Sequence, residues 1–292
     1  MAVLHPLLHQ NISDLGLQRF RVQFTGQEFY LRDHLVQGRS ILPAVAQLEM
    51  AREAVQRSIP SFDVSTQQVR LQHMVWTQPI VVGKDGLTVA IELMADAQGI
   101  IHFEIVGQPG EEGERESYSL GQAIITSLPA NSSSANENLL HLQQALNKQR
   151  MTKEACYEAI HSTGLHYGPS LTGIETLYIG DKKILARIAV PAINMEAQDQ
   201  LVLHPALLDP ALQATLCWEL ANGGDAIDTY LPYALESLEI LAPIPATAWA
   251  LITGQPGAQV GQRILDIDLL NDQGGVCTRM KGLPLPSQHP AS

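Results

Sequence analysis

The sequence predicts an α+β fold of two similar halves, and three observations support this. An alanine-rich helical pattern begins at Pro43, and strand-like runs follow it to Thr126. A second apolar helical pattern begins at Pro210 and is also followed by strand-like runs. Residues 128–136 (LPANSSSAN) lie between them and are mostly small and polar, as is typical of a linker. The repeat is one of element order, because the sequences of the two halves are not alike.

The first half begins with the alternating run 19–24, which predicts a strand. The helix from Pro43 to about Arg57 has apolar residues on one face and charged residues on the others. Strands are predicted at 69–82, 87–94, 100–106 and 118–126, separated by glycine-containing turns. A sheet wrapped around a single helix fits this order of elements.

After the polar stretch, helical patterns are predicted at 139–150 and 153–161, the latter closed by Gly164 as a C-cap. Strands are predicted at 174–178 and 183–190, before a helix from Pro210 to about Ala221. Further strands follow at 235–241, 249–253, 263–270 and 275–281. We therefore divide the chain into a first half (1–128), a linker (129–150) and a second half (151–292).

Composition excludes several classes of function. The net charge is −12 and no run of five basic residues occurs, which disfavours nucleic acid binding. No stretch of 18 apolar residues predicts a membrane span, and the N-terminal residues lack the pattern of a signal peptide. The three cysteines are far apart and show no metal-ligand spacing, so we expect reduced thiols, a cytoplasmic location and no metal site.

His34 stands on a predicted loop just before the first long helix. Gly38 and Pro43 follow it, and proline suits the first helical position because its missing N–H costs nothing there. The N–H groups at a helix start are unpaired and the helix dipole is positive. A base beside such donors suits chemistry on a carbonyl compound. The simpler interpretation is a loop histidine and a turn glycine, since short motifs often occur by chance.

Asp209 has a similar relation to the second helix. It directly precedes Pro210, and Gln213 follows one turn later. The simpler interpretation is a helix start, in which aspartate is the N-cap and proline the first helical residue. Together the two halves nevertheless supply a histidine and a carboxylic acid, each at the mouth of a predicted buried helix.

Four ordered motifs resemble those of dehydratase domains from modular polyketide synthases. They are His34-x3-Gly38-x4-Pro43, Tyr167-Gly168-Pro169, Asp209-x3-Gln213 and Leu231-Pro232. The opening 5–8 (HPLL) is similar to the start of these domains, and 24–29 (FTGQEF) resembles those from assembly lines with separate, trans-acting acyltransferases. The chain departs from the usual pattern at Ala44, Gln47 and Leu171, which puts the pocket shape in question.

The resemblance implies a double hot dog fold: two sheets side by side, each wrapped around a long helix, in a domain cut from a larger multienzyme. It implies a hydro-lyase of polyketide antibiotic biosynthesis. The expected reaction converts a β-hydroxyacyl chain, held on the phosphopantetheine arm of an acyl carrier protein, into the α,β-unsaturated thioester. No cofactor or metal is needed.

The residues of the motifs can perform this reaction. His34 is the expected base at the α-carbon, because imidazole titrates near neutral pH. Asp209 is the expected acid at the β-hydroxyl, and burial among neighbouring leucines would raise its pKa. Gln213 can orient the Asp209 carboxyl. N–H groups near Gly38 and the helix start could stabilise the thioester oxygen.

The roles of the other motif residues follow from the resemblance. The Pro43 carbonyl is expected to hold the second imidazole nitrogen of His34. Tyr167 is expected to offer a hydroxyl to the substrate, with Gly168 shaping its loop, although a packed turn tyrosine is the equal alternative. We interpret His204 as structural, and His166 as a weaker alternative base.

The resemblance also implies partners and rival activities. The expected partners are the acyl carrier protein, neighbouring synthase domains and a second copy of the chain, paired in part through residues 5–8. Related domains shift double bonds or form cyclic ethers, but their acid position is commonly altered. A non-catalytic scaffold domain is a further alternative, which the intact His34 and Asp209 disfavour.

Overall fold

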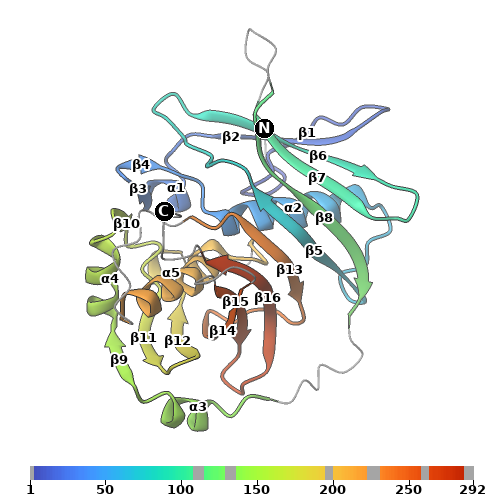
Figure 1. Ribbon diagram of the computed structural model, residues 1–292. Coiled ribbons are helices and arrows are strands. Elements are labelled where there is room, and N and C mark those ends of the chain that lie inside the picture. The colour runs from blue at the N-terminus through green and yellow to red at the C-terminus, as the bar shows by residue number, and fades with distance from the viewer. Residues whose placement is uncertain are drawn as a thin grey trace.

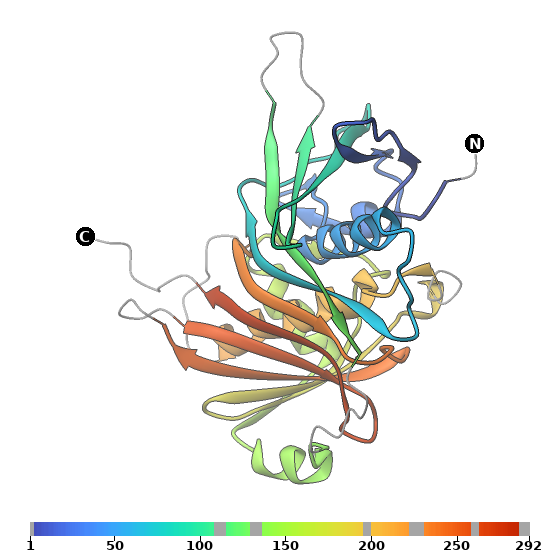
Figure 2. The same ribbon diagram turned by 90° about the vertical axis from the view of Figure 1, so that its right-hand side faces the viewer.

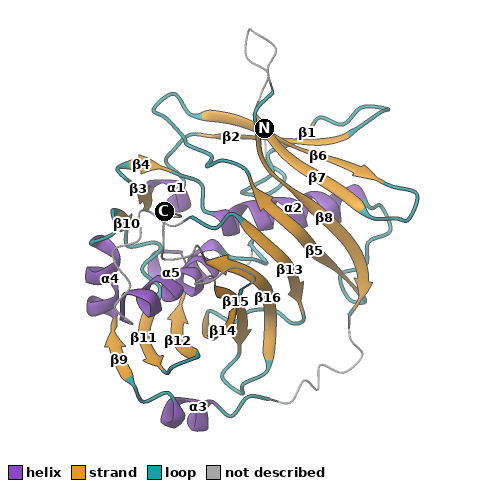
Figure 3. Cartoon of the chain, in the orientation of Figure 1, coloured by secondary structure: helices purple, strands orange, loops and turns teal. Residues whose placement is uncertain are grey.

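Thirteen strands of this chain form one continuous antiparallel sheet (Figure 1). A computed structural model describes residues 3–107, 115–128, 136–194, 200–221, 231–257 and 263–285. The strand order is β1-β2-β6-β7-β8-β5-β13-β16-β15-β14-β12-β11-β9, and a small second sheet has the order β10-β3-β4. Strands greatly outnumber helices in the described chain (Figure 3), which fits the predicted α+β class. Within this part of the chain, no helix is long and apolar enough to cross a membrane.

The first half contains eight strands and two helices. They are β1 (Gln10–Asn11), β2 (Gln18–Phe24), α1 (Phe29–Arg32), β3 (His34–Val36), β4 (Arg39–Ser40), α2 (Ala44–Ser58), β5 (Gln67–Trp76), β6 (Leu87–Ala95), β7 (Ile101–Gly107) and β8 (Ser117–Ser127). The long helix and its strands confirm the predicted order. The run predicted as one strand over 69–82 ends at Trp76.

The second half repeats this plan with additions at its start. Its elements are α3 (Leu139–Ala145), β9 (Gln149–Thr152), α4 (Lys153–His161), β10 (Leu165–Tyr167), β11 (Ile174–Ile179), β12 (Lys183–Ala189), α5 (Pro205–Ala221), β13 (Ala234–Ile240), β14 (Thr247–Pro256), β15 (Arg263–Leu270) and β16 (Val276–Leu285). The helix predicted over 139–150 is wrong beyond Ala145, since β9 pairs with β11 there.

The internal repeat is visible in the strand order. The first half runs β2-β6-β7-β8-β5, and the second runs β12-β14-β15-β16-β13 in equivalent positions. In each half the strand before the long helix occupies one end and the strand after it the other. The two equivalent strands β5 and β13 pair with each other, with Leu71 opposite Leu238. The expected pair of sheets is therefore fused into one.

The two long helices form the centre of the double hot dog. Helix α2 packs against β5, β6, β7 and β8, while α5 packs against β11, β12 and β14. The helices also contact each other, so the apolar cores of the halves merge. Helix α3 lies on the far side of the second half's strands from α2 (Figure 2). It covers a small separate cluster that contains Leu146, Leu185 and Leu251.

Helix α2 is buried on its charged face as well as on its apolar face. Glu49, Arg52 and Glu53 have exposed fractions of 0%, 4% and 6%. Arg52 pairs with both glutamates at 2.6–2.8 Å. The Glu49 carboxylate also accepts N–H groups of Val202 and Leu203 at 3.0 Å. Charged residues on one face of a helix usually contact solvent. Here the second half covers the charged face of α2 and supplies hydrogen-bond donors to it.

Helix α5 begins five residues before the predicted start. Its first residue is Pro205, and the His204 imidazole caps it by accepting the Ala206 N–H at 3.0 Å. Asp209 and Pro210 therefore lie inside the helix, and the N-cap interpretation of Asp209 is wrong. Pro210 has no N–H to give the Ala206 carbonyl. A helix whose side chains are nearly all buried from Pro205 to Trp218 can tolerate this loss, because tertiary packing holds it.

Candidate active site

The small sheet places His34 directly opposite Tyr167. Strand β3 pairs with β10, and the two side chains occupy one register position with ring centroids 5.4 Å apart. Strand β3 turns into β4 through Gln37 and Gly38, whose φ angles are +48° and +74°. A two-residue hairpin of this kind requires positive φ at both positions, which explains the glycine.

The ring of His34 is fixed by the backbone that follows it. Its Nδ1 lies 2.7 Å from the carbonyl oxygen of Ile41, and the Ile41 N–H returns a hydrogen bond of 3.2 Å to the His34 carbonyl. A carbonyl can only accept, so Nδ1 carries the proton and Nε2 has a free lone pair. The expected role of the Pro43 carbonyl is wrong: Ile41 fills it, and the Pro43 oxygen accepts the Ala46 N–H instead.

Asp209 projects from the second turn of α5 and is only 4% exposed. Gln213, one turn later, donates its Nε2–H to Asp209 Oδ2 at 2.7 Å. Burial raises the pKa of Asp209, and it outweighs the lowering effects of the nearby His34 charge and the Gln213 hydrogen bond. The carboxyl therefore favours its protonated form more than an exposed aspartate does.

One narrow pocket brings the two predicted catalytic residues together. His34 and Tyr167 line it from β3 and β10, and Asp209 and Gln213 line it from α5. The remaining wall is mostly apolar: Ala44, Leu212, Thr215, Leu216, Pro232 and Leu283. Pro232 belongs to the fourth sequence motif. The pocket thus joins an imidazole and a carboxyl group from different halves within apolar walls.

Gly38 and Pro43 do not line this pocket. Gly38 lies in the hairpin turn, where an added Cβ would meet nothing within 4 Å. Pro43 directly precedes α2 and sets its start, so Ala44 is the first helical residue. The N–H groups of Ala44 and Val45 have no acceptor among the described residues. These two N–H groups lie at the helix start where free donors were expected, and Ala44 lines the pocket, whereas Gly38 does not.

Asp33 fixes the loop that carries Tyr167, a role that the sequence interpretation missed. Its carbonyl accepts the Gly168 N–H, and its Oδ2 accepts the Ser170 N–H, both at 2.8 Å. A side chain at Gly168 would collide with the Asp33 carboxyl. Burial raises the pKa of Asp33, but hydrogen bonds from Ser170 and Arg32 lower it by more. The pKa of Asp33 is therefore below its usual value. In the sequence, the only indication of a role for Asp33 was its position directly before His34.

Tyr157 is a second residue that sequence reasoning missed. It lies on α4, is 7% exposed, and donates its hydroxyl hydrogen to Gln213 Oε1 at 2.9 Å. Nothing in the spacing of the motifs pointed to it, because α4 reaches α5 only in the folded chain.

The two other histidines considered from the sequence, His166 and His204, do not line the pocket. His166 is opposite Leu35 in the small sheet and its exposed ring is 5.1 Å from that of His161. His204 caps α5 and stacks on Phe29 with ring centroids 5.7 Å apart. Burial lowers the pKa of His204 to about 4. The structural interpretation of His204 fits this position, and His166 is not placed to act as the base.

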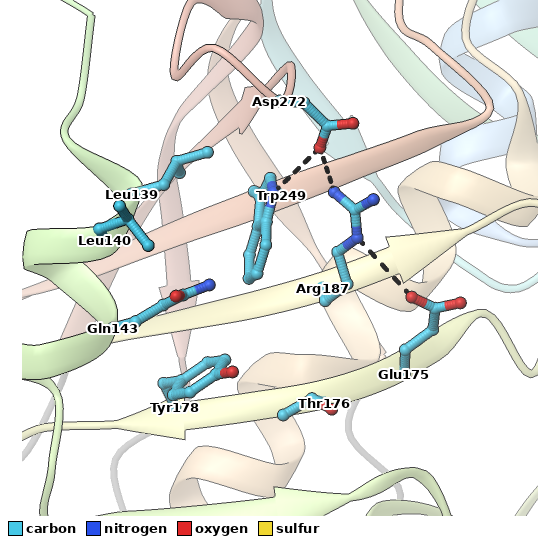
Figure 4. Close-up of a pocket in the computed structure, with 9 residues that line it drawn as sticks. All are labelled: Leu139, Leu140, Gln143, Glu175, Thr176, Tyr178, Arg187, Trp249 and Asp272. Atoms are coloured by element: carbon cyan, nitrogen blue, oxygen red, sulfur yellow. Dashed lines mark hydrogen bonds and ion pairs between the residues drawn. The ribbon is translucent and has the colours of Figure 1, made fainter.

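A second hollow lies on the outer face of the second half's sheet, beneath α3 (Figure 4). Arg187 stacks on the Trp249 ring and pairs with Glu175 and Asp272. Trp249 also donates its indole N–H to Asp272 at 3.2 Å. Each of these charged groups thus has an ion-pair partner, which favours a structural role for this cluster.

One group of side chains has metal-ligating atoms close together. His5, Glu49 and Glu53 present such atoms within 4.8 Å of one another. Arg52 already binds both carboxylates, and Glu49 accepts two backbone N–H groups. The arginine occupies the place that a cation would need, so this cluster is an ion-pair network.

Comparison with known proteins agrees with this geometry. Family models described as "Polyketide synthase dehydratase domain" and "Polyketide synthase dehydratase N-terminal domain" match residues 5–108 and 134–290. The chain is 36% identical to polyketide synthase PksL of Bacillus subtilis over 285 residues, which cover 95% of the chain. That match covers only 6% of PksL, so the chain corresponds to a small part of such proteins.

Two solved structures resemble the chain over nearly its full length. A trans-AT polyketide synthase dehydratase domain from Brevibacillus brevis is 38% identical, with a TM-score of 0.90 and coverage of 97% of this chain and 98% of that one. The dehydratase domain of RzxB from Pseudomonas fluorescens is 27% identical, with a TM-score of 0.82 and coverage of 97% and 100%. With a family model matched in each half and these folds superposing throughout, the chain belongs to the dehydratases of polyketide synthases, a family of hydro-lyases with the double hot dog fold.

Proposed function

We propose that this chain removes water from a β-hydroxyacyl thioester carried on the phosphopantetheine arm of an acyl carrier protein. The product is the α,β-unsaturated thioester. The observation that carries the proposal is the pocket lined by His34 of one half and Asp209 of the other. Its apolar walls suit an acyl chain, since ligand sites combine apolar linings with a few placed polar groups.

His34 acts as the base. Because its Nδ1–H is held by the Ile41 carbonyl, Nε2 is the atom that accepts the α-proton. The electron pair of the broken C–H bond forms the new double bond as the β-hydroxyl departs. The resulting imidazolium is positively charged and lies near Asp209. Its charge lowers the pKa of the Asp209 carboxyl.

Asp209 acts as the acid. Gln213 donates to Oδ2, so the acidic proton belongs on Oδ1, the free oxygen. That proton passes to the departing hydroxyl, which leaves as water. The burial that raises the Asp209 pKa favours the protonated carboxyl that this transfer needs.

Backbone donors and Tyr167 complete the proposed site. The thioester oxygen gains charge as the α-proton leaves, and the Ala44 and Val45 N–H groups at the start of α2 are available to it. Burial raises the pKa of Tyr167 well above its ordinary value, so its hydroxyl is neutral and can hydrogen-bond the substrate. The elimination is redox-neutral, and these groups account for its proton transfers without a cofactor or metal.

The direct test measures loss of water from a β-hydroxyacyl carrier protein by mass spectrometry. His34→Ala and Asp209→Asn should each reduce the rate about 10²–10⁴-fold, the usual contribution of a general base or acid. The two losses should not multiply, because both groups act in one event. Asp209→Asn should fold, since an amide fits the same space, and circular dichroism checks this. A folded Asp209→Asn variant with wild-type turnover would refute the assignment of the acid.

The rival activities predict other products from the same assay. A double-bond shift leaves the mass of an unsaturated substrate unchanged, and ring closure consumes the new alkene. A scaffold domain would leave every thioester intact. The intact pair of His34 and Asp209 favours dehydration over each of these.

The assembly of the chain is also part of the proposal. We assign residues 1–128 and 151–292 to the two hot dog halves, joined by 129–150, which carries α3 and the start of β9 as additions before the repeated plan, with neighbouring synthase domains on either side in a cytoplasmic multienzyme. We further propose a homodimer that pairs in part through residues 5–8. Light scattering that finds only a 31.8 kDa monomer at high concentration would contradict the dimer.

A further inference from the structure

Tyr157 completes a buried hydrogen-bond network that ends on Asp209. Its hydroxyl oxygen accepts the Ile174 N–H at 3.1 Å and its hydroxyl hydrogen points to Gln213 Oε1 at 2.9 Å. Gln213 uses both Nε2 hydrogens, one on Asp209 Oδ2 at 2.7 Å and one on the Leu171 carbonyl at 3.1 Å. Every polar atom of the Gln213 side chain therefore has a partner.

The orientation of the Gln213 amide determines where Asp209 can hold its proton. With Nε2 toward Asp209, Oδ2 must accept, and the proton is left on Oδ1. If the amide were reversed, Oε1 would face the carboxyl and would accept the acidic proton itself. An acid whose proton is tied up in this way cannot protonate a leaving hydroxyl. Dehydration therefore depends on which way a symmetric-looking amide points.

The backbone of the segment after Pro169 sets this direction through Tyr157. The Ile174 N–H can only donate, so the Tyr157 oxygen accepts there and its hydrogen must go elsewhere. The Leu171 carbonyl is 3.4 Å from the hydroxyl and is already served by Gln213, which leaves Oε1 as the better acceptor. Tyr157 in turn requires an oxygen, not an NH₂ group, at that side of the amide.

We propose that Tyr157 is a positioning residue that locks the Gln213 amide so that the proton of Asp209 faces the substrate. This rests on the proposed function, because it assigns Tyr157 a part in the same proton transfer. Tyr157 lines no part of the pocket, so it acts only through Gln213.

Three titratable groups of the described chain interact electrostatically with Asp209. They are His34 on β3, Tyr167 on β10 and Tyr157 on α4. The two tyrosines have pKa values raised far above neutrality by burial, so neither changes charge in the working range. A change in the alkaline limb of the pH–rate profile therefore reports Asp209 in the presence of His34.

Tyr157→Phe tests the lock. Without the hydroxyl, only the Leu171 carbonyl still opposes reversal of the amide, so part of the population can reverse, and kcat should fall about tenfold, a part of the 10²–10⁴-fold that a positioned acid supplies. KM should stay unchanged, because Tyr157 does not touch the pocket. The reversed amide no longer donates to the carboxylate, so the pKa of Asp209 should rise and the alkaline limb of kcat should move to higher pH.

The direction of this shift separates positioning from a loss of packing. A merely loosened core would admit water to Asp209, which lowers its pKa and moves the limb to lower pH. Tyr30→Phe is the matched control: Tyr30 is 2% exposed, and its hydroxyl donates to the Pro6 carbonyl at 3.2 Å, outside the pocket. It should lose some thermal stability and keep the wild-type pH profile.

A double-mutant cycle with Gln213→Met gives the second measurement. Gln213→Met should by itself lower kcat and move the alkaline limb of kcat to higher pH. Adding Tyr157→Phe to this variant should then change neither kcat nor the position of the limb. The proposal would be overturned if Tyr157→Phe had the same effect in the wild-type chain and in the Gln213→Met variant. It would also be overturned if Tyr157→Phe moved the alkaline limb to lower pH. If Tyr157→Phe fails to fold, a Gln213→Met variant with a wild-type profile overturns it alone. The proposed function is tested separately. If the wild-type chain dehydrates the substrate and the Asp209→Asn variant does not, a failed prediction here concerns Tyr157 and not the proposed function.

Discussion

The residues of the pocket owe their chemistry to partners that lie outside it. The Ile41 carbonyl fixes the tautomer of His34, and the Gln213 amide selects one oxygen of Asp209. The motif positions themselves could be predicted from the sequence. Their partners Ile41 and Tyr157 could not, because a carbonyl or a hydroxyl becomes a partner only when tertiary structure brings it within hydrogen-bond distance.

His204 provides a prediction at the same scale. Its pKa is about 4 when folded and about 6.5 in a model peptide, so the unfolded chain takes up the proton first as pH falls. Its contribution to stability is therefore present above pH 6.5 and is lost as pH falls toward 4, to a total of about 3 kcal/mol.

His204→Asn should flatten this dependence, because asparagine can still cap α5 but does not titrate. Urea unfolding between pH 7 and 4.5 measures the slope above the range in which Glu49 contributes. A variant with the wild-type slope would show that another group causes the loss. Some stability should be lost at every pH, since the stacking on Phe29 disappears.

Among the secondary-structure elements, the small β10-β3-β4 sheet has the largest effect on the site. It was not predicted, because strands of two or three residues are too short for a periodic pattern. The long elements were predicted well for the opposite reason. The start of α5 was misplaced because Asp209-Pro210 imitates a helix start, while the true cap is a histidine, an uncommon choice.

Two motif glycines of this region should respond differently to alanine. At Gly168 a methyl group would collide with the Asp33 carboxyl, so the loop that carries Tyr167 must move. Gly168→Ala should therefore lower kcat/KM at least tenfold while the fold persists, an effect on positioning. At Gly38 a methyl group meets open space but positive φ.

Gly38→Ala should accordingly cost about 1–2 kcal/mol of stability, the usual penalty for the left-handed region, with little effect on turnover. Steady-state kinetics and urea unfolding on both variants give the comparison. Equal kinetic defects in the two would mean that Gly38 contacts the substrate after all, as the sequence motif first suggested.

For the molecule as a whole, the contact between the halves decides whether a site exists. The repeat of element order was predictable, because each half carries one helical period followed by several strand periods. The fusion through β5 and β13 was not, since neither strand carries a signal that names its partner. Nor was the burial of Glu49 and Arg52, because helical periodicity assigns charged residues to solvent by default.

Glu49→Gln should destabilise the fold by about 3–5 kcal/mol, because Arg52 would be left buried with only one of its carboxylates. The native carboxylate has a pKa of about 2, so the difference from wild type should shrink as pH falls from 4.5 toward 2. Asp181→Asn is the control, since its pair with Lys148 is exposed and should contribute less than about 1 kcal/mol. Urea unfolding of both variants at pH 7 decides it, and equal losses would contradict the burial argument.

The charged face of α2 also has a consequence during synthesis. A ribosome completes the first half before Val202 and Leu203 exist, so for a time Glu49 and Arg52 lack their covering segment. An unfinished chain that showed an apolar face there would invite association with its neighbours on the same messenger. This one presents an ion pair to water instead. The surface that later joins the halves therefore carries charge at this point, which favours contact with water over association until the second half is made.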